Sequence, residues 1–303
     1  MKVFVTGATG FVGEELVRQL HQAGHSLRLL ARHPTSPRVQ ALVSQYGAEA
    51  YPGDVVTASS LHHALDNMEA VIHLVGIISE VGQSTFENIH TRGTEHLVAA
   101  AQKAGIQRFI HMSALGTRPN ASSRYHQTKW AAEEAVRHSP LAYTIFRPSL
   151  IYGRHDHFVH LFAQVIRRSP FVPLMGNGQA RFQPVSVEMV ATAFVRALSQ
   201  PKAIGQTYDL VGPEVFTFEA LLDRILEAMG RRRWKVRLPL SLARIQAALL
   251  EKIYPRLLRK ASPLNRDQLL MLQEDNVGDG TLANELFGLQ PGRFSEEIRA
   301  YLR

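Results

Sequence analysis

The first thirteen residues constrain the fold of this chain more than any other stretch. Residues 2–6 are a short β-branched and aromatic run typical of a buried strand, and glycines follow at positions 7, 10 and 13. Residues 14–24 then carry apolar side chains at helical spacing and end on a glycine. A strand, a glycine turn and a helix N-terminus form an anion site, because unpaired N–H groups and the helix dipole point at one place.

The glycine spacing is Gly-x-x-Gly-x-x-Gly. A plain strand-to-helix turn also uses glycine, so the argument rests on its position between a strand and a capped helix. In that position the glycines let a pyrophosphate approach the backbone and predict a dinucleotide site. We expect cofactor contacts from Gly7, Thr9, Gly10, Phe11, Val12 and Gly13.

Strand-like and helix-like segments alternate through the first half of the chain. Further strands are expected at residues 25–31, 48–51, 70–76, 107–113 and 142–153, and helices at 38–46, 86–104 and 125–137. This alternation predicts an α/β fold with a Rossmann-type doubly wound parallel sheet. A smaller, mostly helical C-terminal domain should accompany it.

The domain boundaries follow from this reading. We expect the nucleotide-binding domain over residues 1–153, with a return segment near 183–212. The smaller substrate or partner domain should then comprise residues 154–182 and 213–303.

The end of the second strand indicates which dinucleotide binds. An acid there would accept the 2′-OH of NAD, whereas an arginine suits the 2′-phosphate of NADP. Ala31 stands where the acid would be and Arg32 follows, so NADP(H) is favoured over NAD(H). The alternative is that Arg32 is only a solvated charge.

Other cofactor contacts are expected along the same edge of the sheet. Asp54 follows the third strand and either reaches the adenine or caps the helix that begins near Ser59. The remaining expected contacts are Val55, Leu74, Val75, Gly76, Tyr125, Lys129, Pro148 and Ile151.

Tyr125 and Lys129 are the candidate catalytic pair. Four residues apart on a helix, they share one face, so the ammonium can lie near the phenol. Together with a cationic nicotinamide it would lower the phenol pKa from about 10 towards a value useful for proton transfer. Ser113, twelve residues earlier at the end of the fifth strand, is the candidate that polarises a carbonyl.

These residues carry a family resemblance. The glycine turn, Tyr125, Lys129 and the segment 147–153 (Arg-Pro-Ser-Leu-Ile-Tyr-Gly) resemble an extended short-chain dehydrogenase/reductase. More narrowly, the chain is similar to the NADPH-binding accessory subunits of respiratory complex I and their bacterial relatives. The segments that carry this similarity are 109–115, 122–129, 147–154, 207–217 and 275–277. The resemblance implies NADP(H) binding with a link to respiratory or quinone metabolism.

Two positions depart from the full catalytic pattern of that family. Ser113 is followed by Ala114, where extended members usually carry the second, catalytic hydroxyl, and His90 stands at the usual helix asparagine. The pattern therefore resembles the atypical branch, in which several members bind cofactor without known turnover. Three hypotheses stay open: a cofactor-binding accessory protein, an active NADPH-dependent reductase or NAD(P)-dependent epimerase/dehydratase, and an NADP(H)-sensing regulatory or docking protein.

The positive charge of the chain is concentrated in residues 231–260. This segment holds ten basic residues and one acid, whereas the rest of the chain holds 24 basic and 25 acidic residues. Within it, Leu242, Ile245, Leu249, Ile253 and Leu257 fall on one helical stripe. An apolar stripe with cationic charge suits an anionic membrane surface or an acidic respiratory partner. The alternative is a stripe packed on the protein, with solvated charges.

Several other classes of site or location are not expected. The chain has no cysteine, which excludes disulfides and thiolate zinc sites, and aromatic residues do not interleave with the arginines of the basic segment, so nucleic acid is not expected as a partner. His155, His157 and His160 suggest a metal site, but a polar loop explains them as well and no metal is expected.

Without a signal-peptide pattern or an apolar run of about 18 residues, we expect a cytoplasmic protein. Peripheral attachment would then be at the inner face of the membrane.

Overall fold

The computed structural model describes residues 1–254, 262 and 264–302. Its centre is a seven-stranded sheet in the order β11-β6-β5-β4-β1-β2-β3, and all neighbouring pairs are parallel. The strands are β1 (Lys2–Thr6), β2 (Ser26–Ala31), β3 (Glu49–Pro52), β4 (Ala70–His73), β5 (Arg108–Met112), β6 (Tyr143–Pro148) and β11 (Gln206–Leu210). The predicted Rossmann-type doubly wound α/β fold is confirmed.

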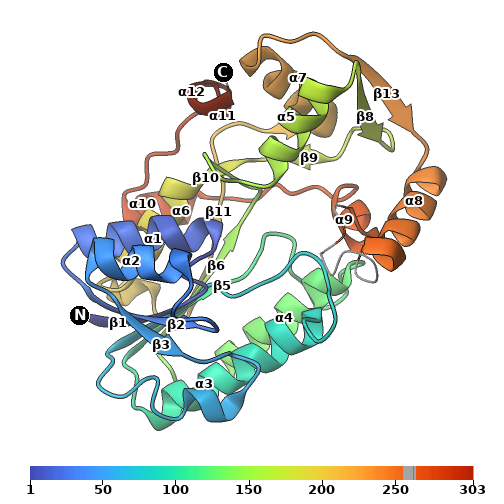
Figure 1. Ribbon diagram of the computed structural model, residues 1–303. Helices are drawn as coiled ribbons and strands as arrows, with labels where there is room; N and C mark the ends of the chain where they lie inside the picture. Colours follow the sequence, from blue (N-terminus) through green and yellow to red (C-terminus); the bar gives the residue numbers. More distant parts are fainter. Residues whose placement is uncertain (255–261, 263, 303) are drawn as a thin grey trace.

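Helices cover both faces of this sheet (Figure 1). Val3 and Val5 of β1 lie in the core beneath helices of one face, whereas Phe4 lies in the core of the other face. This alternation follows from the period of two in a strand. One face carries α1 (Phe11–Gln22), α2 (Pro37–Tyr46) and α6 (Val187–Ala197), and the other carries α3 (Gly93–Lys103) and α4 (Arg124–Arg137).

A smaller lobe with its own apolar core follows the sheet (Figure 1). Its main elements are α5 (Phe158–Arg168), β8 (Phe171–Met175), α7 (Phe218–Ala228), β13 (Trp234–Leu238), α8 (Leu240–Ile253), α9 (Arg266–Met271), α11 (Phe294–Glu297) and α12 (Arg299–Leu302). Short strand pairs complete it or join it to the sheet domain: β7 (Ile151–Tyr152) with β10 (Val185–Ser186), and β9 (Arg181–Phe182) with β12 (Phe216–Thr217).

One helix within the range predicted for the smaller domain packs elsewhere. α10 (Thr281–Phe287) places Phe287 in the core of the large sheet, 5.4 Å from the Phe146 ring and 5.2 Å from the Tyr208 ring. The chain therefore returns to the Rossmann core a second time, after the predicted return segment near 183–212.

Two predicted elements are shorter or differently coiled than expected. The strand predicted over 70–76 ends at His73, because its neighbour β1 ends at Thr6 and Gly7 turns the backbone away. The helix predicted over 86–104 begins with a π-helical stretch, Glu87–Arg92, before α3. None of the helices in the described ranges is long and apolar enough to cross a membrane.

Candidate functional site

The glycine turn between β1 and α1 has the geometry of an anion cradle. Gly7 adopts φ +77°, which favours glycine, and its carbonyl oxygen accepts a 3.0 Å hydrogen bond from the Gly10 N–H. A Cβ at Gly13 would lie 2.1 Å from the Gly7 oxygen, so no side chain fits there without moving the turn. Gly7 and Gly10 thus form the tight turn, and Gly13 allows the helix backbone to pack closely against it.

Backbone N–H groups at this turn are available to a ligand. The helical ladder starts with the Glu14 N–H bound to the Gly10 oxygen at 3.0 Å, so the N–H groups of Phe11, Val12 and Gly13 precede it. Gly10 is the N-cap and has no side chain to satisfy them. This arrangement fits the pyrophosphate of a dinucleotide.

The loop after β4 lies against this turn and extends the site along the sheet edge. A Cβ at Gly7 would meet the Leu74 and Val75 backbone at 3.2 Å, and a Cβ at Gly76 would lie 3.2 Å from Nζ of Lys129. The crevice therefore runs between the ends of β1 and β4, where the strand order reverses. The structure brings the predicted residues Gly7, Leu74, Val75, Gly76 and Lys129 together.

Lys129 is buried beneath Gly76. Its Nζ donates a 3.0 Å hydrogen bond to the Met112 carbonyl oxygen, and its residue exposure is only 2%. Burial lowers the pKa of Lys129 to about 8, against an opposing effect of Glu133. The hydrogen bond thus holds the ammonium at one place. A pKa of about 8 means that this side chain loses its proton at moderately alkaline pH.

Tyr125 lies one turn earlier on the same helix, α4. Its ring packs edge-on against Phe86 and His90, with centroid separations of 6.0 and 5.3 Å. Burial raises the pKa of the Tyr125 phenol to about 12. The protein surroundings therefore act against the lowered phenol pKa expected from the sequence. That Lys129 and a nicotinamide lower the pKa of Tyr125 stays a prediction.

Ser113 points into the protein. It is 2% exposed, and its hydroxyl donates a 3.3 Å hydrogen bond to Oγ1 of Thr117. The next residue, the half-buried Ala114, offers no hydroxyl. The assignment of Ser113 as the group that polarises a carbonyl stays a prediction.

His90 has a structural task that the sequence did not indicate. Its Nε2 accepts a 3.0 Å hydrogen bond from the Ile77 N–H, and its Nδ1 lies 2.9 Å from Oγ1 of Thr128 on α4. Burial, and then the charge of Lys129, hold the pKa of His90 well below its usual range. The neutral ring therefore carries its proton on Nδ1 and ties the loop after Gly76 to the helix of Tyr125.

The residues expected at the adenosine end occupy the far side of the crevice. Arg32 is exposed directly after β2. The Asp54 carboxylate accepts a 3.2 Å hydrogen bond from the Val56 N–H, and the Ser60 hydroxyl donates to the Asp54 carbonyl at 2.9 Å. Asp54 thus fixes the turn after β3, and its contact with adenine stays a prediction. Val55 packs against Gly93, where a Cβ would lie 2.9 Å from it.

Pro148 and Ile151 follow β6 at the same edge of the sheet. The Pro148 carbonyl accepts a 2.9 Å hydrogen bond from the Leu115 N–H, and Ile151 pairs with Val185 in a short parallel bridge. Their cofactor contacts are untested.

Among the histidines near the second lobe, His160 lies 3.4 Å from Asp156 and stacks on Tyr301, and the described residues contain no group of three metal-ligating side chains.

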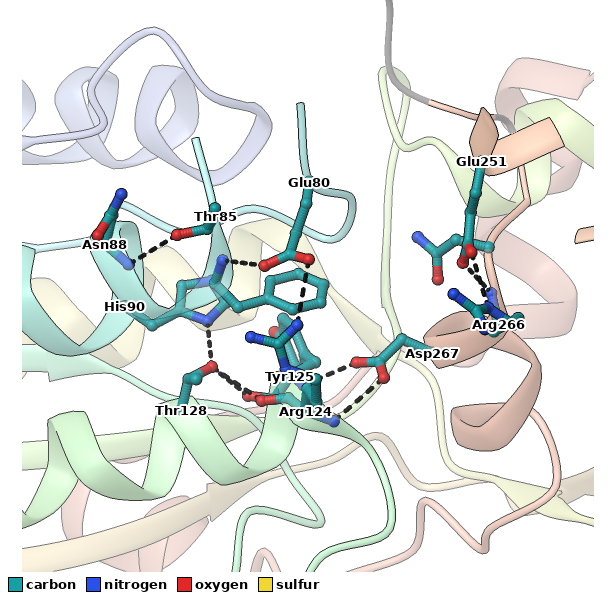
Figure 2. A network of polar contacts seen from close by, with 12 residues as sticks. Glu80, Thr85, Asn88, His90, Arg124, Tyr125, Thr128, Glu251, Arg266 and Asp267 are labelled. Carbon is teal, nitrogen blue, oxygen red and sulfur yellow. Dashed lines mark hydrogen bonds and ion pairs between the residues drawn. The ribbon is translucent and has the colours of Figure 1, made fainter. Parts of the chain in front are cut away.

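A cavity of about 500 Å³ lies beside the helix of Tyr125. Figure 2 shows the polar network that surrounds it, in which the Asp267 carboxylate accepts hydrogen bonds from the N–H groups of Arg124 and Tyr125 at 3.1 and 2.7 Å. The lining combines paired charges with apolar groups, and none of its members was predicted. It consists of Ser79, Glu80, Phe86, Arg124, Glu251, Ser262, Asn265, Arg266, Asp267 and Leu270.

One sequence signal could have located this wall of the cavity. Asn265 and Gln268 form a capping box, in which each side chain bonds the backbone N–H of the other residue at the start of α9. The Asn265 side chain also donates to the Ile78 carbonyl at 2.8 Å. The cap predicts a helix start, but not its contact with the Rossmann domain.

Comparison with known proteins gives consistent relatives. A sequence model described as NAD(P)H-binding matches residues 7–201. The chain is 33% identical to the mitochondrial NADH dehydrogenase [ubiquinone] 1 alpha subcomplex subunit 9 of Arabidopsis thaliana, over 95% of this chain and 73% of that protein. It is 32% identical to the ceramide reductase of Caulobacter vibrioides, over 78% of this chain and 73% of that protein.

The fold also matches solved structures. The UDP-glucose 4-epimerase of Thermotoga maritima superposes with a TM-score of 0.77 at 20% identity, over 100% of this chain and 97% of that one, which shows a shared fold. The chain spans between 65% and 73% of the length of the first curated relatives.

Proposed function

The chain belongs to the NAD(P)H-binding family, with relatives among the complex I alpha subcomplex subunit 9 proteins and ceramide reductase, and we propose that it is an NADP(H)-dependent reductase. The observation that carries this proposal is the position of Lys129 Nζ, directly beneath Gly76 in the crevice, with Tyr125 one turn earlier. The proposed substrate is a carbonyl or quinone group on an apolar molecule, a class suggested by the names of these relatives.

NADP(H) is proposed over NAD(H) because of the end of β2. Exposed Arg32 offers a guanidinium to a 2′-phosphate, and the preceding Ala31 offers no carboxylate to a 2′-OH. Arg32→Asp should therefore weaken NADPH binding at least about tenfold and leave NADH binding equal or tighter. Exposed Arg92, the last residue of the π-helical stretch before α3, provides the matched control R92D. An unchanged NADPH affinity in R32D would exclude this role.

In the proposed reaction each side chain has one role. NADPH, when bound, supplies the hydride that adds to the substrate carbon. The Tyr125 hydroxyl donates its proton to the substrate oxygen, and the Lys129 ammonium stabilises the phenolate that remains. Lys129 is held for this by the Met112 carbonyl, and water then returns the proton to Tyr125.

The second candidate function is a protein that holds NADP(H) without turnover, as an accessory subunit or a sensor. The observation that favours it is the inward hydrogen bond of Ser113 to Thr117, followed by Ala114. With that pattern neither residue 113 nor residue 114 presents a hydroxyl that could polarise a carbonyl beside Tyr125.

One experiment separates the two candidates. Single-turnover oxidation of bound NADPH is followed with a ubiquinone analogue and with long-chain keto lipids, in wild type and Tyr125→Phe. The reductase proposal predicts turnover that falls roughly 10²–10⁴-fold in Y125F while NADPH affinity is unchanged. If no oxidant accelerates NADPH loss in wild type, the holding function is the correct one.

We also propose that the protein works at a membrane or at a membrane-bound respiratory partner. The relatives' names include ubiquinone and ceramide, both apolar molecules, and residues 231–260 of this chain carry ten basic residues and one acid. A basic surface near an apolar substrate source would raise the local concentration of the protein there. Co-sedimentation with membranes of the source cell, and its loss at high salt, tests this placement.

A further inference from the structure

Helix α8 turns its aliphatic stripe outward. Leu242, Ile245, Leu249 and Ile253 are 54%, 59%, 55% and 45% exposed, whereas the small Ala243 and Ala247 are fully buried against the lobe. The stripe is about 17 Å long at 1.5 Å per residue. An amphipathic helix normally buries its large apolar residues, so the reversed orientation of α8 calls for an external apolar partner.

A second exposed apolar set lies immediately before α8. Trp234 and Val236 on β13 are 72% and 47% exposed, and the Trp234 ring lies 5.6 Å from that of Phe171, itself 46% exposed. In Figure 1, β13 leads into α8 along one edge of the smaller lobe. Of the thirteen large apolar side chains that are exposed in the described residues, seven belong to β8, β13 and α8. Such concentration differs from the scattered exposed residues of an ordinary surface.

The charges around these elements favour an anionic partner. Arg231, Arg232, Arg244 and Lys252 are exposed on or beside β13 and α8, whereas Arg237 lies 3.8 Å from the Glu219 carboxylate. The only acid of α8, Glu251, points inward, where its carboxylate accepts hydrogen bonds of 2.8 and 2.7 Å from the side chain and backbone of Arg266. The outer side of α8 therefore combines aliphatic groups with positive charge and carries no carboxylate.

We propose that the outer face of α8 lies in the interfacial layer of an anionic lipid bilayer, with its aliphatic stripe among the upper acyl chains. This inference rests on the proposed function at a membrane and names the surface that makes the contact. A bilayer accepts a convex, featureless aliphatic stripe, whereas a protein partner would have to supply a matching groove. Basic side chains beside the stripe then meet lipid phosphates.

Docking through α8 would place the cavity beside Arg124 near the membrane. Glu251, on the inner side of the helix, lines the 500 Å³ cavity that also contacts Arg124, the neighbour of Tyr125. The same helix thus faces lipid on one side and the cavity on the other. An apolar substrate would have only the thickness of the α8 layer to cross.

The predicted stripe continues to Leu257, with the basic residues Arg256, Arg259 and Lys260 close to it in the sequence, but these four lie outside the described residues. The test therefore uses α8 alone. Sedimentation with phosphatidylcholine vesicles containing phosphatidylglycerol is measured for wild type, for Ile245→Glu/Leu249→Glu, and for the control Leu282→Glu. Leu282 is 69% exposed on α10, away from the basic segment.

Wild type and L282E should bind vesicles at low salt and release them at high salt, and I245E/L249E should bind at least about tenfold more weakly.

A fluorescence measurement gives a second readout. Because the chain has no cysteine, a single Ile245→Cys carries an environment-sensitive dye, with Leu282→Cys as control. The dye at 245 should shift to the blue with vesicles and the dye at 282 should not. No vesicle binding by wild type, or equal binding by I245E/L249E, overturns the inference in favour of a protein partner.

NADPH binding and turnover are measured in the same variants. If the wild-type protein binds vesicles but shows no NADPH turnover, the proposed reductase function is wrong and the proposed lipid surface stands. Normal NADPH turnover without vesicle binding would remove only the lipid surface.

Discussion

The carboxylate of Asp267 accepts a 2.7 Å hydrogen bond from the backbone N–H of Tyr125, 142 residues earlier in the chain. Asp267 sits in the first turn of α9 and also accepts the Arg124 N–H, so one side chain caps the first turn of α4 from outside. This contact joins the smaller lobe to the helix that carries the candidate catalytic pair. The position of Tyr125 therefore depends on α9 as well as on the Rossmann sheet.

Asp267→Ala should destabilise the protein by about 1–2 kcal/mol, because two N–H groups at the start of α4 lose their acceptor. Urea unfolding measures this change. The matched control is Asp66→Ala, which removes an exposed pair with His63 and should change stability by less than about 0.5 kcal/mol. A loss in D267A below about 0.5 kcal/mol would contradict the predicted contribution of this contact.

Gly13→Ala should abolish dinucleotide binding, because its Cβ would fall 2.1 Å from the Gly7 oxygen and force the turn open. Gly24→Ala is the control, since that glycine has φ +77° but no atom within 4 Å of an added Cβ. G24A should lose about 1–2 kcal/mol of stability through its backbone angle and keep its nucleotide affinity. Isothermal titration with NADPH, beside thermal unfolding, distinguishes the two effects, and retained affinity in G13A would contradict the cradle.

Lys129→Met should stabilise the ligand-free protein near pH 7 by roughly 2 kcal/mol, because burial of the ammonium is unfavourable. The folded pKa of Lys129 is about 8, below the ordinary 10.5, so the unfolded chain binds the extra proton between these values. Wild-type stability should therefore gain a contribution as pH rises from about 8 to 10.5, and K129M should lack it. Exposed Lys103 on α3 gives the control K103M, whose pH dependence should follow wild type.

The sequence sufficed for features that local pattern determines. The glycine turn, the alternation of strands and helices, and the one-turn spacing of Tyr125 and Lys129 each depend on residues close in the chain. The strand end at His73 was harder to predict, since it depends on where the neighbouring β1 stops, a property of pairing and not of residues 70–76 themselves.

Features that depend on distant contacts escaped prediction for a physical reason. Neither Asp267 nor His90 belongs to a short pattern that specifies its partner, because their contacts on α4 lie 142 and 38 residues away. The stripe of α8 was visible in the sequence, but periodicity cannot say which face packs on the lobe. Here Ala243 and Ala247 fill the inner side, because only small residues allow that close approach, and the large residues are left outside.

Two buried histidines on adjacent strands should respond in opposite ways to replacement. His111 on β5 is 1% exposed, and neither of its ring nitrogens has a hydrogen-bond partner among the described residues. His73 on β4 is fully buried but bonded, with Nδ1 2.7 Å from Oγ1 of Thr6 and Nε2 3.0 Å from Oγ1 of Thr94. His111→Leu should therefore stabilise the protein by about 1–2 kcal/mol, whereas His73→Leu should destabilise it by a similar amount.

The pH dependence gives these substitutions a second readout. Burial lowers the pKa of His73 to about 3 and that of His111 well below 6.5, so the unfolded chain binds more protons between about pH 3 and 6.5. Stability should fall as pH drops through that window, and H111L should show a shallower fall because one of these groups is gone. Urea unfolding free energies at pH 7 and pH 5 measure both effects. If the unfolding free energy of H111L changed with pH as steeply as that of wild type, His111 would have the same pKa in the folded and unfolded states.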